Sequence, residues 1–307
     1  MAASALTNAK AFPIQEHSVA RLAALRDYWA LTKPEVNVLI GVAAAAGYYL
    51  GCRLQAHAMS SMSLAHTTLG TVLTAGGAAT LNQYIERHYD ARMRRTASRP
   101  LASGRLDEAA AVRFGIVLSL SGVVYLAMTT NASAALLALL TSVTYLWMYT
   151  PLKRRTSVCT FVGALSGAMP PMIGWAAASA QLSVAAPLLY AVVVLWQFPH
   201  FMAIAWTHRE DYDRAGYQIL PFGACGARIM AWQATAPTAA LIPFSLALMI
   251  VMDAGWPSLA ATLVLGTGFA VAAVQLAVRR SKVAARRLLR ASIAYLPALL
   301  LLTVAAA

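Results

Sequence analysis

Long apolar stretches, separated by short polar segments, follow one another along almost the whole chain. Those long enough to cross a bilayer as a helix of about 20 residues are the predicted spans. They cover residues 35–52, 65–88, 111–130, 132–150, 158–178, 184–206, 229–252, 256–278 and 288–306. The third and fourth spans nearly touch at Asn131, where we expect a tight turn. The stretches do not alternate polar and apolar residues, so the pattern predicts helices and not a β-barrel.

The composition agrees with this pattern. Hydrophobic residues make up 60% of the 307 positions, charged residues only 11%, and the mean hydropathy is +0.62. Such a chain is too apolar for a soluble globular protein, so we predict an all-α, polytopic membrane protein. We expect a cytoplasmic arm over residues 1–30, which lacks the apolar core of a secretory signal, and one nine-helix domain over residues 31–307.

Charge assigns the orientation of the helices. Of the 24 Lys and Arg residues, all but Arg53 lie before the first span or around the loops that follow the even-numbered spans. This asymmetry predicts that the N-terminus and the even-numbered loops are cytoplasmic and that the C-terminus is periplasmic. Because the basic residues are divided among short loops, nucleic-acid binding is the weaker interpretation of the net charge of +13.

The charges also suggest an internal repeat. Spans 2 and 6 end in acids mixed with arginines, whereas spans 4 and 8 end in purely basic segments. Two four-helix units, residues 31–155 and 156–287, followed by a ninth helix, would produce this order. Duplicated units with a site between them are common in membrane proteins.

Three oxygen-bearing side chains follow one another at the end of the second span. Asn82, Glu86 and Asp90 are spaced four residues apart, so they lie on one face of a helix. Carboxylate and amide oxygens suit Mg²⁺, which binds a few carboxylates together with substrate phosphates. The alternative is an ordinary helix end, at which Glu86 pairs with a neighbouring arginine. Acids at the end of an apolar span are costly, which favours a functional role.

A second acidic set, Asp211 with Glu210 and Asp213, is predicted at the same membrane face. Basic residues that could bind a diphosphate accompany the two sets: Arg94, Arg99, Lys153 and Arg154. Each of these residues also satisfies the positive-inside rule without any ligand. The combination of acids and bases at one face favours a diphosphate whose apolar tail enters the bilayer.

At these residues the sequence resembles the UbiA-type intramembrane prenyltransferases, and in particular their heme-modifying branch. The resemblance covers about residues 31–221 and rests on Asn82, Glu86 and Asp90 and on "LTKP", "DARMRRTASRPL", "YTPLKRRT", "GAMPPMIGW", "PHFMAIAW" and "DYDRAGYQILP". It implies helices around a central cavity open to lipid, and a Mg²⁺ site formed by Asn82, Glu86, Asp90 and Asp211. It also implies transfer of a farnesyl group from farnesyl diphosphate to a vinyl group of heme b, with addition of water. The product would be heme O for heme-copper oxidases.

Aromatic and histidine side chains are further candidates. Tyr84, Tyr89 and Tyr149 could shield the allylic cation by cation–π contact, although tyrosines near helix ends also form interface belts. His200 follows Pro199 inside the sixth span, where a histidine is costly unless it faces a cavity. It is a candidate heme ligand, and the alternative is a packed, hydrogen-bonded histidine.

Two other functions compete with this interpretation. One is prenylation of an aromatic or quinone precursor by the same superfamily. The other is cation transport, which would place acids near the middle of the spans and not beside arginines at their ends. The expected setting is a bacterial inner membrane, where membrane lipid surrounds the chain. A heme A synthase or an oxidase assembly factor is a candidate downstream partner.

Overall fold

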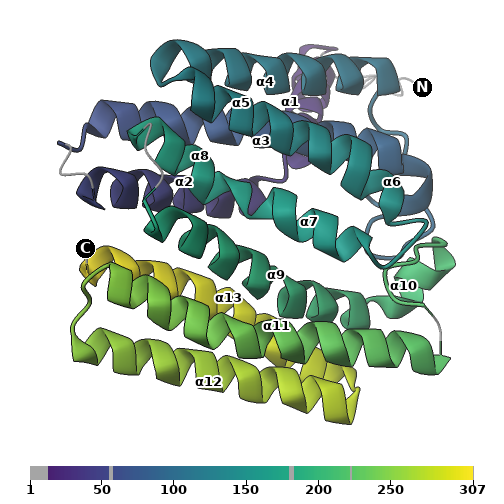
Figure 1. Ribbon diagram of the computed structural model, residues 1–307. Helices are drawn as coiled ribbons and strands as arrows, with labels where there is room; N and C mark the ends of the chain where they lie inside the picture. The colour runs from purple at the N-terminus through teal and green to yellow at the C-terminus, as the bar shows by residue number, and fades with distance from the viewer. Residues whose placement is uncertain (1–12, 55–57, 180–182, 222, 307) are drawn as a thin grey trace, which may run out of the picture.

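The computed structural model describes residues 13–54, 58–179, 183–221 and 223–306, and in these ranges the chain forms helices and no strand (Figure 1). The helices are α1 (Pro13–Leu31), α2 (Pro34–Leu54), α3 (Ser61–Asp90), α4 (Glu108–Thr129), α5 (Ala132–Val143), the π-helix η1 (Thr144–Tyr149), α6 (Thr150–Leu152), α7 (Cys159–Gly167), α8 (Met169–Ala178), α9 (Ala185–Thr207), α10 (Arg209–Arg214), α11 (Gly223–Val251), α12 (Trp256–Arg279) and α13 (Lys282–Ala306).

The prediction of an all-helical, multi-pass membrane fold is confirmed. Within the described residues, 8 helical segments are long and apolar enough to cross a membrane. They correspond to every predicted span except the second. That stretch, residues 65–88, is also helical, but α3 carries many threonine, glycine, amide and charged residues and is not among the apolar eight.

Two predicted spans are interrupted helices. Residues 132–150 form α5 and then the wider π-helical turns of η1, before α6 completes the segment. Residues 158–178 break at Ala168, which ends α7 and precedes α8, whose first turn contains Pro170 and Pro171. A proline lacks the N–H that a continuous helix would need at these positions.

Helices of the first half approach one another closely through small residues. A Cβ added to Gly47 of α2 would lie 1.9 Å from the carbonyl oxygen of Pro171 in α8, and one added to Gly174 would lie 1.9 Å from that of Ala44. Only glycine permits backbones to pass at this distance, which is a common packing mode in membrane helices. This contact fixes α2 against α8.

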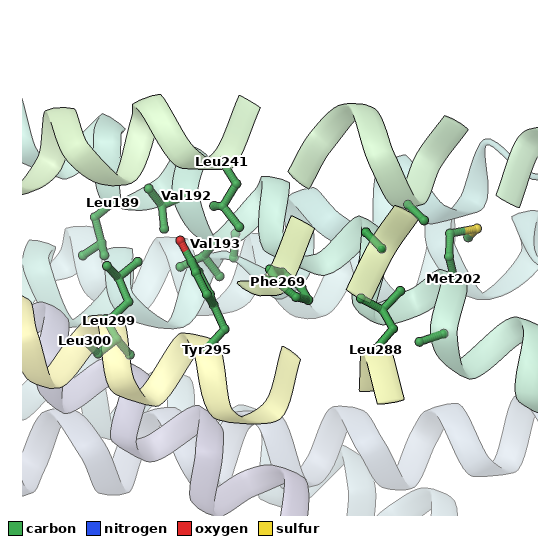
Figure 2. Packing of buried hydrophobic residues seen from close by; sticks show 14 of the residues in the cluster. Leu189, Val192, Val193, Met202, Leu241, Phe269, Leu288, Tyr295, Leu299 and Leu300 are labelled. Atoms are coloured by element: carbon green, nitrogen blue, oxygen red, sulfur yellow. The ribbon is translucent and has the colours of Figure 1, made fainter. Parts of the chain in front are cut away.

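The second half is packed around large apolar side chains contributed by α9, α11, α12 and α13 (Figure 2). Phe269 stacks on Tyr295 with ring centroids 5.0 Å apart, and the Tyr295 hydroxyl lies 2.8 Å from Ser245 Oγ. The polar end of the buried tyrosine is therefore satisfied, as a low-dielectric interior requires.

Polar contacts shape the connections between the helices. Asn131 forms the expected tight turn, since its Oδ1 caps α5 by accepting from the N–H of Ala134 at 2.9 Å. At one end of the bundle the loop after α3, the end of α6 and the short α10 lie together (Figure 1). Two hydrogen bonds join them: the Arg94 N–H donates to Asp211 at 3.2 Å, and the Gln218 N–H donates to the Lys153 carbonyl at 2.7 Å.

Candidate active site

The polar face of α3 is buried where the helix approaches this end of the bundle. Asn82, Glu86 and Asp90 are 1%, 6% and 2% exposed, and the fourfold spacing aligns them along one face of the helix. Two carboxylates in such surroundings are costly unless they are paired. Each must therefore have a partner close by.

Three cations from three other segments supply the partners. Lys33 Nζ donates to Asn82 Oδ1 at 3.1 Å, Lys153 Nζ to Glu86 Oε1 at 2.8 Å, and Arg99 Nη1 to Asp90 Oδ2 at 2.7 Å. The sequence predicted Lys153 and Arg99 as diphosphate ligands, and the structure brings both to the acids. Lys153 and Arg99 balance the charges of Glu86 and Asp90, and the protonated form of Lys33 adds a positive charge that suits an anion.

Lys33 is a site residue that our sequence reasoning missed. It connects α1 to α2 with a positive φ of 51°, a conformation that costs a non-glycine residue about 1–3 kcal/mol. The turn is held by Gln83, whose amide donates to the Leu31 carbonyl at 2.8 Å, and by Asn37, whose amide donates to the Thr32 carbonyl at 2.8 Å. Burial and the nearby Arg99 lower the pKa of Lys33 to about 7. The one available signal was a lysine beside a proline at the start of an apolar span.

The π-helical segment positions the next group of side chains. Tyr145 donates from its hydroxyl to Asn82 Oδ1 at 3.1 Å, and Asn82 donates in turn to Thr150 Oγ1 at 3.1 Å. Lys153 Nζ lies 4.5 Å from the ring centroid of Tyr149. Although burial opposes its charge, Glu86 and these tyrosines raise the pKa of Lys153 well above its usual value, so it is protonated at neutral pH. Tyr145 was not predicted.

Asp211 belongs to a second polar cluster. Its Oδ1 accepts from the Arg94 N–H at 3.2 Å and from Arg214 Nη1 at 3.0 Å. Burial opposes the carboxylate, but these donors outweigh it and lower the pKa of Asp211. Arg94 therefore contacts Asp211 through its backbone N–H and not through its guanidinium.

The oxygen atoms of these side chains suit a hard cation such as Mg²⁺. They do not by themselves form a complete coordination shell. Within the described ranges, His, Cys, Asp and Glu side chains do not gather in any group of three or more able to hold one metal ion. The oxygens of Asn82, Glu86 and Asp90 form one set and Asp211 another. This suits Mg²⁺, which needs only one or two carboxylates when substrate phosphates complete its coordination.

The three predicted tyrosines differ in their surroundings. Tyr149 lies over Lys153 and stacks on Tyr145 at 5.5 Å. Tyr89 receives a hydrogen bond from Arg154 Nη1 at 2.7 Å, so the structure places Arg154 on this tyrosine and not on a carboxylate. Tyr84 packs in another cluster, 4.2 Å beneath the guanidinium of Arg87. The structure therefore does not bring Tyr84 to the cations beside the acids.

Tyr217 is another residue that the sequence did not single out. Its side chain is buried, and its hydroxyl faces the Glu86 carboxylate without forming a hydrogen bond of ordinary geometry within the described residues. Burial, together with the negative charge of Glu86, raises the pKa of Tyr217. A buried hydroxyl that interacts only weakly with a neighbouring carboxylate can form a stronger hydrogen bond with a ligand.

His200 is a residue of α9 whose side chain faces α13. Its Nδ1 is 2.8 Å from Ser292 Oγ, and its ring stacks on Trp196 at a centroid distance of 4.8 Å. The Ser292 hydroxyl also lies 2.7 Å from the Leu289 carbonyl, to which it donates. With its one proton used there, Ser292 accepts from Nδ1–H, and Nε2 keeps a free lone pair.

Comparison with known proteins agrees with this fold. The model of the UbiA prenyltransferase family matches residues 38–296. A protoheme IX farnesyltransferase from Solibacter usitatus is 43% identical over 279 residues, which cover 89% of this chain and 96% of the relative. A relative of the same name from Koribacter versatilis is 41% identical over 282 residues, covering 90% and 91%.

A solved structure of a digeranylgeranylglyceryl phosphate synthase superposes with a TM-score of 0.73 at 15% identity, covering 92% of this chain and 97% of that one. It shares the fold. Since the family model and the relatives extend over most of the sequence, the chain belongs to the UbiA prenyltransferase family.

Proposed function

We propose that the protein transfers the farnesyl group of farnesyl diphosphate to a vinyl group of heme b, with addition of water, to give heme O. The observation that carries this proposal is the buried row of Asn82, Glu86 and Asp90, each bonded to a cation from a different segment. The curated relatives named protoheme IX farnesyltransferase support the choice of acceptor.

Magnesium is the proposed cofactor. A solved homologue from Archaeoglobus fulgidus is described as bound to GPP and Mg²⁺, with a TM-score of 0.59 at 16% identity. In this chain Asn82, Glu86 and Asp90 would hold one ion and Asp211 a second. Bound there with substrate phosphates, Mg²⁺ would offset the negative charge that develops on the leaving diphosphate.

The basic side chains stabilise the same charge. As the bond between the allylic carbon and the diphosphate oxygen breaks, the electron pair leaves with the diphosphate. Lys33, Lys153 and Arg99 can turn from the carboxylates toward the phosphate oxygens, because their donors already converge on α3. Removing one preorganised donor of this kind typically lowers kcat by about 10²–10³. Arg94 and Arg154 are proposed to bind the diphosphate from the outer side.

Aromatic side chains protect the allylic cation until the acceptor attacks. Tyr149 and Tyr145 stack beside Lys153, and their ring faces offer negative potential without a nucleophile. Tyr89 is proposed to assist, whereas Tyr84 packs elsewhere and is the weakest of the predicted candidates. The vinyl π electrons then form the new carbon–carbon bond. Water adds to the resulting cation beside the porphyrin and loses a proton, which completes the hydroxyethylfarnesyl side chain.

His200 is proposed to bind the iron of heme b through Nε2. The hydrogen bond from Nδ1–H to Ser292 fixes the tautomer that presents this lone pair, as in other metal-ligating histidines. Titrating the purified protein with ferric heme would test this role. We expect His200→Ala to change the Soret band and weaken binding, whereas His208→Ala, at the end of α9, should leave the spectrum unchanged. Identical spectra for both variants would refute ligation.

The proposed setting is a bacterial inner membrane. The distribution of Lys and Arg supports a cytoplasmic N-terminus, cytoplasmic loops around the site and a periplasmic C-terminus. A water-soluble diphosphate head would then approach from the cytoplasm while its tail remains in lipid. The heme O product must pass to a heme-using protein, for which a heme A synthase or an oxidase assembly factor is the candidate.

A product assay tests the proposed function. The protein in detergent receives heme b, farnesyl diphosphate and Mg²⁺, and the hemes are then separated and weighed by mass spectrometry. We expect a heme heavier by one farnesyl group and one hydroxyl group, which is absent with EDTA and with Glu86→Gln. Glu108→Gln is the matched control, since Glu108 pairs with Arg87 on the surface. Unchanged heme b, with prenylation of a hydroxybenzoate-type acceptor, would show that the acceptor is wrong.

A further inference from the structure

A groove of about 560 Å³ lies outside the active site, where α1 ends and α2, α3 and α4 meet. Its walls are almost entirely apolar and include Trp29, Val38, Val42, Val72, Phe114 and Leu118. This volume lies within the range of about 300–1,000 Å³ that is typical of ligand sites. The groove is therefore large enough to hold part of a lipid chain.

The groove and the active site use successive stretches of α3, since the groove is lined by residues from Thr68 to Gly76 and the site is formed by residues from Asn82 to Asp90. Gly76 lines the groove, whereas Asn82 binds Lys33 in the site. The connecting turn also separates the two sites, because Thr32 and Pro34 line the groove while Lys33 reaches the acids.

Helix α1 is fixed over one end of the groove. Arg105 binds Asp27 through two hydrogen bonds of 3.0 Å, and Tyr28 packs edge-on against Phe114 at 5.1 Å. Phe114 is itself part of the groove wall. In Figure 1, α1 runs across the direction of the other helices, as an interfacial helix would.

The uncovered side of α1 combines apolar and basic residues. Leu22, Leu25 and Trp29 are exposed at spacings of three and four residues, so they form one stripe that ends at the groove. Arg21 and Arg26 flank the stripe and are also exposed. An apolar stripe edged by arginines is the pattern of a helix that lies on an anionic membrane surface.

We infer that the groove and the apolar stripe of α1 form one binding site for an anionic phospholipid. An acyl chain would occupy the groove between α2 and α4, Arg26 would bind the phosphate at its α1 end, and Arg21 on the other edge of the stripe would add positive potential. Charge complementarity selects this occupant, because a zwitterionic lipid gains less from two arginines. The exposed Val36 and Leu39 of α2 continue the apolar surface along the bundle, as a membrane lipid requires.

Native mass spectrometry of the full chain in detergent, titrated with phosphatidylglycerol or phosphatidylcholine, tests the inference. A basic residue near a membrane surface strengthens anionic lipid binding roughly fivefold. We therefore expect Arg26→Gln to weaken phosphatidylglycerol binding roughly fivefold and to leave phosphatidylcholine unchanged. Arg228→Gln, an exposed arginine near the start of α11, is the matched control and should have no effect.

A second pair of variants tests the groove itself. Val42 lines it and is 52% exposed, whereas Val124 of α4 is 54% exposed and does not line it. We expect Val42→Trp to displace the tightly bound phosphatidylglycerol and Val124→Trp to leave it bound. Equal binding of both lipids, or equal behaviour of the two tryptophan variants, would show ordinary surrounding lipid only and would overturn the inference. Displacement by farnesyl diphosphate would also overturn it, by assigning the groove to the substrate tail.

Discussion

Replacing Lys153 by methionine removes one partner of a buried ion pair while keeping most of its apolar stem. The Lys153 Nζ–Glu86 Oε1 distance is 2.8 Å, and the two side chains are only 12% and 8% exposed. Without Lys153, the Glu86 carboxylate stays buried with its main compensating charge gone. Breaking a buried pair in this way costs about 3–5 kcal/mol.

The double variant Lys153→Met/Glu86→Gln separates stability from catalysis. Since it removes both charges, it should recover most of the free energy of unfolding that either single variant loses. It should nevertheless stay inactive, because both a proposed magnesium ligand and a diphosphate ligand are gone. Unfolding in mixed micelles titrated with dodecyl sulfate gives the stability, and the heme product assay gives the activity.

The chain provides a matched ion pair as control. Lys282 and Glu210 are also 2.8 Å apart, but their side chains are 47% and 62% exposed. Water screens such a pair, so Lys282→Met should not measurably change stability. The reasoning is refuted if Lys153→Met is as stable as Lys282→Met, or if the double variant is no more stable than the single ones.

Three further predictions follow from other contacts. Gly174→Ala should destabilise the protein strongly, because its Cβ would lie 1.9 Å from a carbonyl oxygen of α2, whereas Gly268→Ala has free space and should be neutral in the same unfolding assay. Tyr217→Phe removes a hydroxyl that faces Glu86 without a well-formed hydrogen bond, so it should change stability only slightly but lower kcat about tenfold if the hydroxyl serves the substrate. Arg105 lowers the pKa of Asp27 by hydrogen bonding, so the pair stabilises α1 above about pH 4 and loses this contribution as pH falls further. Thermal unfolding measured across pH should show this dependence in the unsubstituted protein. Asp27→Asn should abolish it.

The sequence predicted the membrane helices well because a segment in the hydrocarbon core must form its backbone hydrogen bonds within itself. Each apolar stretch had to become a helix, and the Asn131 turn followed from the lack of space between two spans. The fourfold spacing of Asn82, Glu86 and Asp90 likewise fixed a common face before any tertiary contact was known. The proposed internal repeat stays a prediction.

The partners of these residues were harder to predict because they come from distant segments. Lys33 reaches Asn82 across 49 positions of the sequence, through a left-handed turn that local propensity does not favour. Tyr84 and Tyr89 looked equivalent in the sequence, yet five residues along a helix separate their directions by about 140°. Only one of them therefore lies beside the loop that carries Tyr217.

The π-helical turns of η1 have a consequence for how this span can change during evolution. A π-turn holds an extra residue per hydrogen-bonded ring, so it shifts the angular phase of everything that follows it. The angular positions of Tyr149 and Lys153, which face the site, are therefore independent of the angular positions of the lipid-facing residues of α5. Both groups nevertheless belong to one continuous helical segment. Deleting a single residue from η1 would be absorbed by a return to α-helical turns that keeps Lys153 facing Glu86, whereas deleting one from the regular turns of α5 would rotate the residues that follow by about 100°.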